Sequence, residues 1–201
     1  MRQATYEKIS GLSRRYHGYM RTEQLLAEGI TNRQIAVLRQ EDILERITVG
    51  IYWVKCDDIK KPEDYKMIEV SLGNENAIIC ADSACFLQGL IYVEPKVLSI
   101  ATRRSDRKQM SMNFQIARHF YSDASFEQDY HKVQTKFGAY KVYDIDRSVC
   151  DCIRFRNDID QDIFELVIES YRKSSQRQTD RLLEYAEKMR VNKQAHAILG
   201  E

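Results

Sequence analysis

The chain has 201 residues, 43% of them hydrophobic, which is enough to bury a core and argues against a disordered protein. Its 31 lysines and arginines nearly balance its 30 aspartates and glutamates, so the net charge excludes no class of partner. The sequence holds no run close to the ~18 apolar residues of a membrane helix, and its N-terminal stretch lacks a signal-peptide core. We therefore expect a cytoplasmic protein with no membrane partner.

Turn and cap residues predict three short helices at the start of the chain. A first amphipathic stretch ends at Gly18, and Thr22 is placed to cap a second helix that closes at Gly29. Thr31 followed three residues later by Gln34 is the pattern of a capping box, in which each side chain bonds to the backbone of the other residue. The third helix is therefore expected to begin at Thr31.

The segment ILERITVGIYWV, residues 43–54, predicts a β-hairpin. Its two apolar arms meet at Val49 and Gly50, and glycine supplies the backbone freedom of a tight turn. Three helices followed by a hairpin is the element order of a winged helix-turn-helix domain, which we assign to residues 1–58. Residues 1–56 carry nine Lys or Arg and six Asp or Glu, so their local net charge of +3 suits nucleic acid.

The third helix is expected to turn a polar face outward. Ile35 and Leu38 share one side of a helical wheel, and the opposite side carries residue types that contact base edges. The candidate base-reading residues are Asn32, Arg33, Ala36, Val37 and Gln40. The candidate contacts to the DNA backbone are Arg14, Arg15, Arg21, Arg39 and Arg46. The alternative is an ordinary three-helix core with a solvated polar face, since winged helices also serve as protein-interaction modules.

The rest of the chain predicts a mixed α/β domain with a helical C-terminal part. A polar linker at residues 56–61 precedes Pro62, which suits the first turn of a new helix. Strands and a second hairpin are expected between residues 96 and 145, and helices after Asp146. The sequence thus predicts an α+β protein whose second domain spans residues 62–201.

The cysteine pattern favours free thiols. Cys56, Cys80, Cys85, Cys150 and Cys152 are odd in number and lack the paired spacing of zinc ligands, and the four histidines are scattered singly. We expect reduced, partly buried thiols, and we predict no metal site and no cofactor.

Asp82, Glu94 and Lys96 match the spacing of a metal-dependent nuclease, in which two carboxylates hold Mg²⁺. That chemistry needs the acids on adjacent strands. Here Asp82 or Ser83 is expected to cap a helix, and Pro95 interrupts the motif at a strand start. No glycine-rich phosphate loop or nucleophile elbow accompanies the motif. We therefore predict no catalytic residues and no enzyme, and keep a nuclease as the weakest alternative.

Two long segments carry a resemblance to a known family. GYMRTEQLLAEGITNRQIAVLRQEDILERITVGIYWV, residues 18–54, and VYDIDRSVCDCIRFRNDIDQDIFELVIESYRK, residues 142–173, resemble the AbiEi family of antitoxins from bacterial abortive-infection operons. Four pieces match in order: the N-terminal winged helix, DSACFLQGL, RSVCDCIRFRN and LLEYAEKMRV. The resemblance spans nearly the whole chain.

The resemblance implies a division of labour. Its N-terminal domain is implied to bind inverted repeats in the operon's own promoter, and its C-terminal domain to neutralise a nucleotidyltransferase-type toxin without needing a stable complex. One departure concerns the wing, where the family often has Arg-Arg-Gly and this chain has Thr48-Val49-Gly50. That leaves Arg46 as the charge of the wing. The alternative function is a winged-helix transcription regulator without a toxin partner.

The C-terminal half carries cations that are candidates for an antitoxin surface. RRSDRK, residues 103–108, follows a predicted strand, and RSVCDCIRFRN contributes further arginines. The candidate residues are Arg103, Arg104, Arg107, Lys108, Arg118, Arg154 and Arg156. The alternatives are a solvated loop for the first group and a buried helix with local ion pairs for the second.

Overall fold

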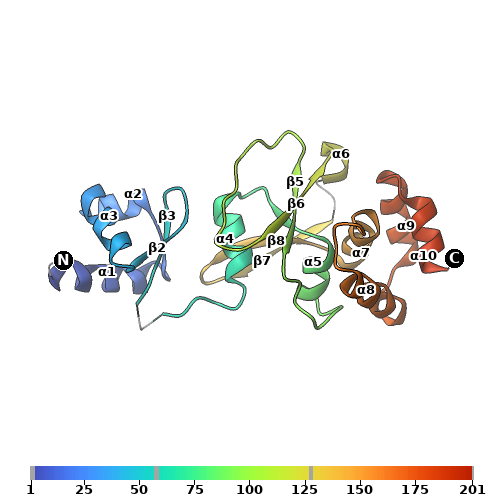
Figure 1. The fold of residues 1–201 in the computed structure, drawn as a ribbon, viewed down its shortest axis with the longest axis horizontal. Coiled ribbons are helices and arrows are strands. Elements are labelled where there is room, and N and C mark those ends of the chain that lie inside the picture. The colour runs from blue at the N-terminus through green and yellow to red at the C-terminus, as the bar shows by residue number, and fades with distance from the viewer. Residues whose placement is uncertain (1–2, 57–58, 127–128, 201) are drawn as a thin grey trace. The chain divides into compact units, whose positions relative to one another are not determined.

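A computed structural model describes residues 3–56, 59–126 and 129–200. These residues form ten helices and two β-sheets, so the predicted α+β class is confirmed (Figure 1). None of the helices in these ranges combines the length and apolar character needed to cross a bilayer.

The chain divides into two compact units. The first takes the described residues up to 75 together with 109–113 and 134–139, and the second takes the remainder. The first compact unit continues to residue 75, past the domain boundary predicted between residues 58 and 62. Whether residues 1–58 form a domain of their own stays a prediction.

The first unit contains seven elements in its described residues. They are α1 Gln3–Arg15, β1 Tyr19–Arg21, α2 Thr22–Ala27, α3 Asn32–Gln40, β2 Leu44–Thr48, β3 Ile51–Val54 and α4 Tyr65–Gly73. The strands form an antiparallel sheet in the order β1-β3-β2. Apolar side chains from α1, α2, α3 and the sheet make one core. The hairpin of β2 and β3 was predicted, whereas β1 is too short to show a periodicity in the sequence.

Gly18 is required by a close approach to β3. Its φ is +85°, and a Cβ at this position would lie 2.3 Å from the ring of Trp53. Glycine therefore serves here both for its left-handed backbone and for its missing side chain. The residues that follow pair directly with β3, with Tyr19 opposite Trp53.

The prediction that Thr22 caps α2 is wrong. The helix already begins at Thr22, and Arg21 is its N-cap. The reason is that β1 leads straight into the helix, and the backbone N–H of Arg21 donates to Gln24 Oε1 at 2.7 Å. Thr22 Oγ1 instead donates weakly to the carbonyl of Gly50, at 3.4 Å.

A buried charge network joins the hairpin to α4 within the first unit. Lys61 Nζ lies 2.8 Å from a carboxylate oxygen of Glu69 and 3.0 Å from one of Glu45. The Tyr19 hydroxyl donates to Glu69 at 3.0 Å. Burial raises the pKa of Glu69. Burial would lower the pKa of Lys61, but the two carboxylates outweigh it and raise this pKa. The Lys61 ammonium thus forms ion pairs with both Glu45 and Glu69.

Removing this ammonium should destabilise the first unit. Lys61→Met leaves Glu69, whose side chain is only 1% exposed, without its counter-charge. The loss expected for breaking a buried pair is about 3–5 kcal/mol of unfolding free energy, measured by urea titration followed by circular dichroism. Lys60→Met is the matched control, because Lys60 is exposed and should change stability by less than about 0.5 kcal/mol. Equal stabilities of the two variants would show that the network contributes little.

The second sheet runs in the order β6-β5-β4-β8-β7. Its strands are β4 Ile78–Ile79, β5 Leu98–Arg103, β6 Ile116–Tyr121, β7 Tyr130–Thr135 and β8 Gly138–Tyr143. Strand β4 is antiparallel to β5 and parallel to β8, and β5 is parallel to β6. The helices of the second unit are α5 Ala81–Leu87, α6 Asp123–Phe126, α7 Ile145–Arg154, α8 Gln161–Lys173, α9 Thr179–Lys188 and α10 Asn192–Leu199. Helices α5 and α7 to α10 pack with the sheet into one core.

Helix α7 carries an ion pair into that core. Arg147 Nε lies 3.1 Å from Asp151 Oδ1, and the two side chains are 1% and 0% exposed. The guanidinium also lies over the rings of Tyr143, at 4.3 Å, and Tyr121, at 5.1 Å. Burial opposes the charge of Arg147, but Asp151 outweighs it and raises its pKa. The RSVCDCIRFRN segment thus begins as a buried helix with a local ion pair, and it leaves the helix after Arg154 and is exposed at Arg156.

His119 on β6 is buried without a partner for one ring nitrogen. The residue is 6% exposed, its ring centre lies 4.0 Å from that of Phe155, and Nε2 makes no hydrogen bond to the described residues. Burial lowers the pKa of His119 below 6.5, Arg154 adds to this effect, and Asp158 opposes it. The folded protein therefore binds this proton more weakly than the unfolded chain does.

Acid should cost stability through His119. As pH falls below 6.5 the unfolded chain takes up the proton first, so the unfolding free energy falls, by at most about 2 kcal/mol between pH 6.5 and 5. His119→Phe should remove this part of the pH dependence in urea titrations at several pH values. His131→Phe, at an exposed position on β7, is the control and should keep it. Parallel pH profiles for the two variants would contradict the assignment.

Candidate nucleic-acid interface

The start of α3 is fixed by side chains on both sides of the cap. The backbone N–H of Gln34 donates to Thr31 Oγ1 at 3.3 Å, and the backbone N–H of Thr31 donates to Gln34 Oε1 at 2.8 Å. Ile30 before the cap and Ile35 after it are both buried in the core of the unit. The predicted capping box is confirmed and fixes where the helix begins, and the burial of Ile35 and Leu38 sets how the helix is rotated about its axis.

That rotation puts the predicted polar face at the surface. Ile35 and Leu38 are buried, while the other side of α3 is open to solvent. Asn32, Arg33, Ala36, Arg39 and Gln40 are exposed, and Val37 is half-buried. Whether these residues contact bases stays a prediction, but their side chains are available for it.

The hairpin beside α3 presents little charge at its tip. Val49 is 80% exposed at the turn, and Gly50 there has a φ of +74°. Arg46 pairs across the hairpin with Tyr52 and is exposed, and its Nε donates to the carbonyl of Thr48 at 3.4 Å. A cation therefore lies on the strand of the hairpin, while the turn itself is apolar.

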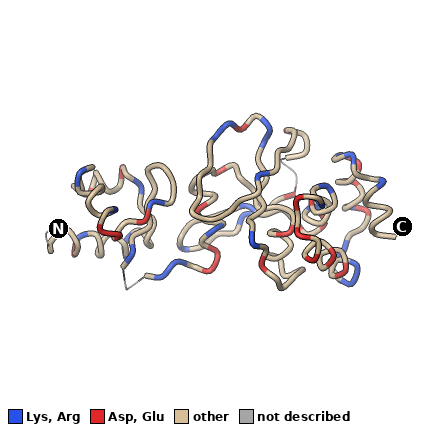
Figure 2. The backbone as a smooth tube through the Cα atoms, in the orientation of Figure 1, with Lys and Arg blue, Asp and Glu red and all other residues tan. Residues whose placement is uncertain are grey.

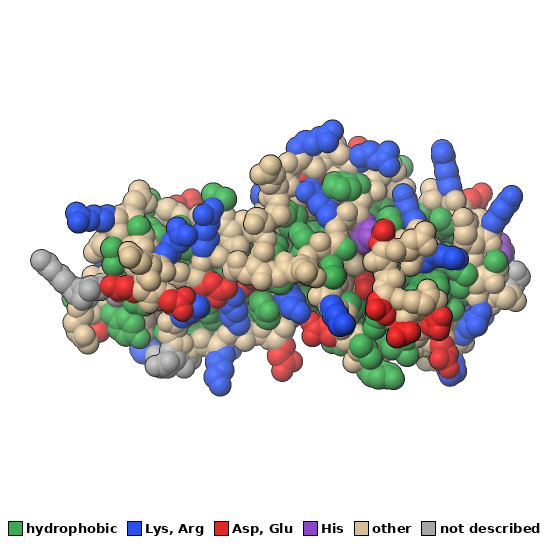
Figure 3. Space-filling view, in the orientation of Figure 1, with side chains coloured by type: hydrophobic (Ala, Val, Ile, Leu, Met, Phe, Trp, Pro, Cys, Tyr) green, Lys and Arg blue, Asp and Glu red, His purple; other side chains and the backbone are tan. Residues whose placement is uncertain are grey.

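The remaining arginines of the first unit differ in their surroundings. Arg14 and Arg15 end α1, Arg21 ends β1, and all three are exposed. Arg15 forms an ion pair with Glu28 at 3.0 Å, so part of its charge is already balanced. Figure 3 shows Lys and Arg side chains standing out from the N-terminal part of the chain, with Asp and Glu side chains near them.

The predicted antitoxin cations fall into two groups. Arg104, Arg107, Lys108 and Arg156 are exposed. Arg103 forms an ion pair with Asp123 at 2.9 Å, and Arg118 and Arg154 are half-buried. The guanidinium of Arg154 lies 5.2 Å from the ring centres of both Tyr121 and Phe155. A sequence cannot distinguish such arginines from surface ones, because stacking on aromatic rings leaves no spacing pattern.

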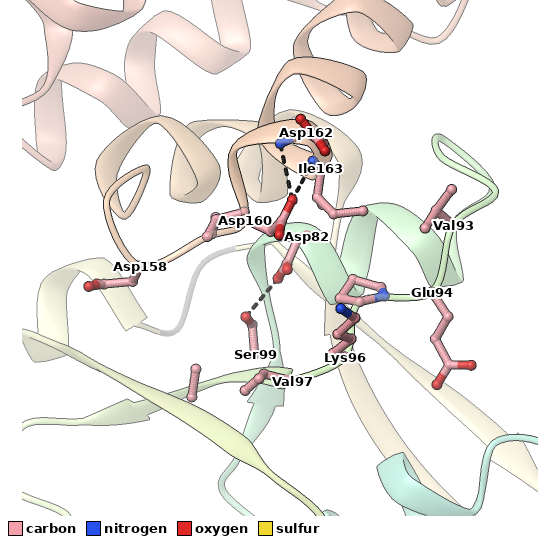
Figure 4. A pocket seen from close by; sticks show the side chains of 13 residues that line it. Asp82, Val93, Glu94, Lys96, Val97, Ser99, Asp158, Asp160, Asp162 and Ile163 are labelled. Carbon is pink, nitrogen blue, oxygen red and sulfur yellow. Dashed lines mark hydrogen bonds between the residues drawn. The ribbon is translucent and has the colours of Figure 1, made fainter.

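The residues of the nuclease motif line one pocket of about 410 Å³ in the second unit (Figure 4). Asp82, Glu94 and Lys96 share it with Asp158, Asp160 and Asp162, acids at alternating positions whose distance along the sequence gives no sign of this proximity. In Figure 4 the carboxylates of Glu94 and Asp158 point away from that of Asp82. Within the described residues, no three His, Cys, Asp or Glu side chains are grouped so that they could hold a metal ion.

The prediction that Asp82 or Ser83 caps α5 is wrong. The N-cap is Cys80, and Asp82 lies in the first turn. Its carboxylate is directed to β5 instead, where Ser99 Oγ donates to it at 2.7 Å, and the backbone N–H of Ser83 adds a bond at 2.8 Å. Burial raises the pKa of Asp82, although these hydrogen bonds oppose the shift.

Comparisons with known proteins support the fold. No family model matches the chain. No curated protein matches it either. The crystal structure of the Rv2827c protein from Mycobacterium tuberculosis is similar, with a TM-score of 0.60 and 13% sequence identity, over 96% of this chain and 79% of that one. At this identity the likeness shows a shared fold and nothing about activity.

Proposed function

We propose that the chain is a DNA-binding repressor whose first unit acts as a winged helix, with α3 in the major groove. The observation that carries the proposal is the outward face of α3, where Arg33 and Gln40 are exposed on a helix whose start is held by a capping box. Arginine suits guanine and glutamine suits adenine. The hairpin of β2 and β3 would contact the flanking backbone through Arg46.

We further propose that the chain is an antitoxin that counteracts a nucleotidyltransferase-type toxin. The support is the resemblance of residues 18–54 and 142–173 to the AbiEi family. A transcription regulator without a toxin partner is the alternative. A neighbouring gene for a nucleotidyltransferase-like protein, tested by co-expression and growth, distinguishes the two.

Arg33→Ala should weaken binding to the DNA upstream of the chain's own gene by about 1–3 kcal/mol and relax the preference at one base position. A helix side chain that reads a base loses both affinity and discrimination when it is truncated. Fluorescence anisotropy with a set of single-base variants of the site measures both effects.

The matched control for Arg33 is Arg39→Ala on the same helix. A contact to phosphate should weaken operator and random DNA alike and reduce the slope of log affinity against log salt by about 0.9. If Arg33→Ala behaves like this control, or changes nothing, Arg33 does not contact a base as proposed.

The two activities should separate in the full-length chain. Arg33→Ala with Gln40→Ala should relieve promoter repression while the toxin is still neutralised. The set Arg103, Arg104, Arg107 and Lys108 to Ala should keep operator binding and lower growth rescue. The three exposed residues should each change stability by less than about 0.5 kcal/mol. Arg103 pairs with Asp123, so a thermal melt must confirm that the variant is folded. Reporter expression and growth at matched protein levels measure the two outcomes. Full rescue by the four-residue variant would make the cluster a solvated loop.

A further inference from the structure

Arg118 fastens the loop that joins β5 to β6, residues 104–115. Its Nε donates to Thr102 Oγ1 at 2.8 Å, and its two terminal nitrogens donate to the backbone carbonyls of Lys108, at 2.6 Å, and Asp106, at 3.1 Å. The guanidinium also forms an ion pair with the Asp106 carboxylate at 3.3 Å. The polar contacts of Arg118 are therefore made with Thr102 and with residues 106–108, the first part of the loop, which they hold against β6.

The acid of this loop is turned inward and its cations outward. The Asp106 side chain is only 14% exposed, and besides Arg118 it accepts the backbone N–H of Lys108 at 2.8 Å. Arg104, Arg107 and Lys108 are exposed. Figure 2 shows their blue segments on either side of the acidic one along the loop after β5. The loop thus presents three positive charges whose local acid is already occupied.

An exposed aromatic ring lies on the adjoining strand. Phe120 is 44% exposed on β6, an edge strand of the sheet. The Arg118 guanidinium lies 5.0 Å from the centre of its ring, which steadies the ring from one side. The C-terminal end of β6 also contacts the start of the loop, because the backbone N–H of Arg104 donates to the carbonyl of Tyr121 at 2.8 Å. Arg118 thus joins the strand that carries the ring to the part of the loop that carries Arg107 and Lys108.

We propose that this surface, formed by Arg104, Arg107, Lys108 and Phe120, binds single-stranded nucleic acid. Cations that follow a loop suit successive phosphates, and an unpaired base can stack on an exposed phenylalanine, whereas a base in a duplex cannot. An acidic protein surface could also contact these cations, and the competition experiment below distinguishes the two partners. The inference concerns what the surface binds, and it holds whether or not the chain neutralises a toxin.

The test is anisotropy with the full-length protein, no toxin, and labelled single strands of twelve thymidines or twelve uridines. The variant Arg104, Arg107 and Lys108 to Ala should lose about tenfold or more in affinity at 0.1 M salt. Its salt slope should fall by about 2, since each phosphate contact of a single strand contributes about 0.7. The two oligonucleotides distinguish DNA from RNA as the source of the strand.

Phe120 is tested separately, because stacking does not depend on salt. Phe120→Ala should lower affinity about tenfold with an unchanged salt slope, and Phe120→Tyr should restore it. The matched control removes three exposed lysines elsewhere in the second unit, Lys96, Lys132 and Lys193, and should leave single-strand affinity nearly unchanged. Thermal melts confirm that each variant is folded. Photo-crosslinking of a 5-iodouridine strand to the wild-type protein, mapped to the peptide that contains Phe120, gives a readout that needs no variant.

Three outcomes would overturn the proposal. Equal losses in the loop variant and the lysine control would mean unspecific charge attraction. Loss of single-strand binding in Arg33→Ala with Gln40→Ala would place it on α3. Polyglutamate that competes as well as the uridine strand at equal charge would point to an acidic protein partner.

Discussion

A cation shielded from water needs carboxylate or carbonyl partners, and three such cations, one in the first unit and two in the second, fix the structure around them. Lys61 sits between Glu45 of the hairpin and Glu69 of α4. Arg147 is buried in the core of the second unit, where it pairs with Asp151. Arg118 takes the carbonyls of a loop. A charge that is wholly or mostly shielded from water needs a geometry that supplies its partners, so each one restricts the backbone around it.

Local signals in the sequence were enough for the elements whose causes are local. The capping box of Thr31 and Gln34 and the turn at Gly50 each depend on a few neighbouring residues, and both lie where we predicted them. The exposed face of α3 follows from the same start, because once Ile35 is buried the helical repeat places Arg33 and Gln40 outside.

Features that depend on distant partners could not be predicted in this way. The parallel pairing of β5 with β6 and of β4 with β8 is decided by packing across the sheet. The burial of individual arginines could not be predicted either, because arginine is usually a surface residue. Only tertiary structure shows that Arg118 is committed to a loop. The sequence predicts Asp82 or Ser83 as a cap because such residues favour helix starts, but Ser99, seventeen positions after Asp82, binds the Asp82 carboxylate.

The way in which Arg118 grips its loop has a consequence for evolution. It binds two carbonyl groups of the main chain, and these are present whatever side chains stand at positions 104, 107 and 108. Mutation can therefore exchange the outward residues without dismantling the support beneath them. Successive substitutions at these positions can therefore change what the surface binds, while the main-chain support from Arg118 stays the same.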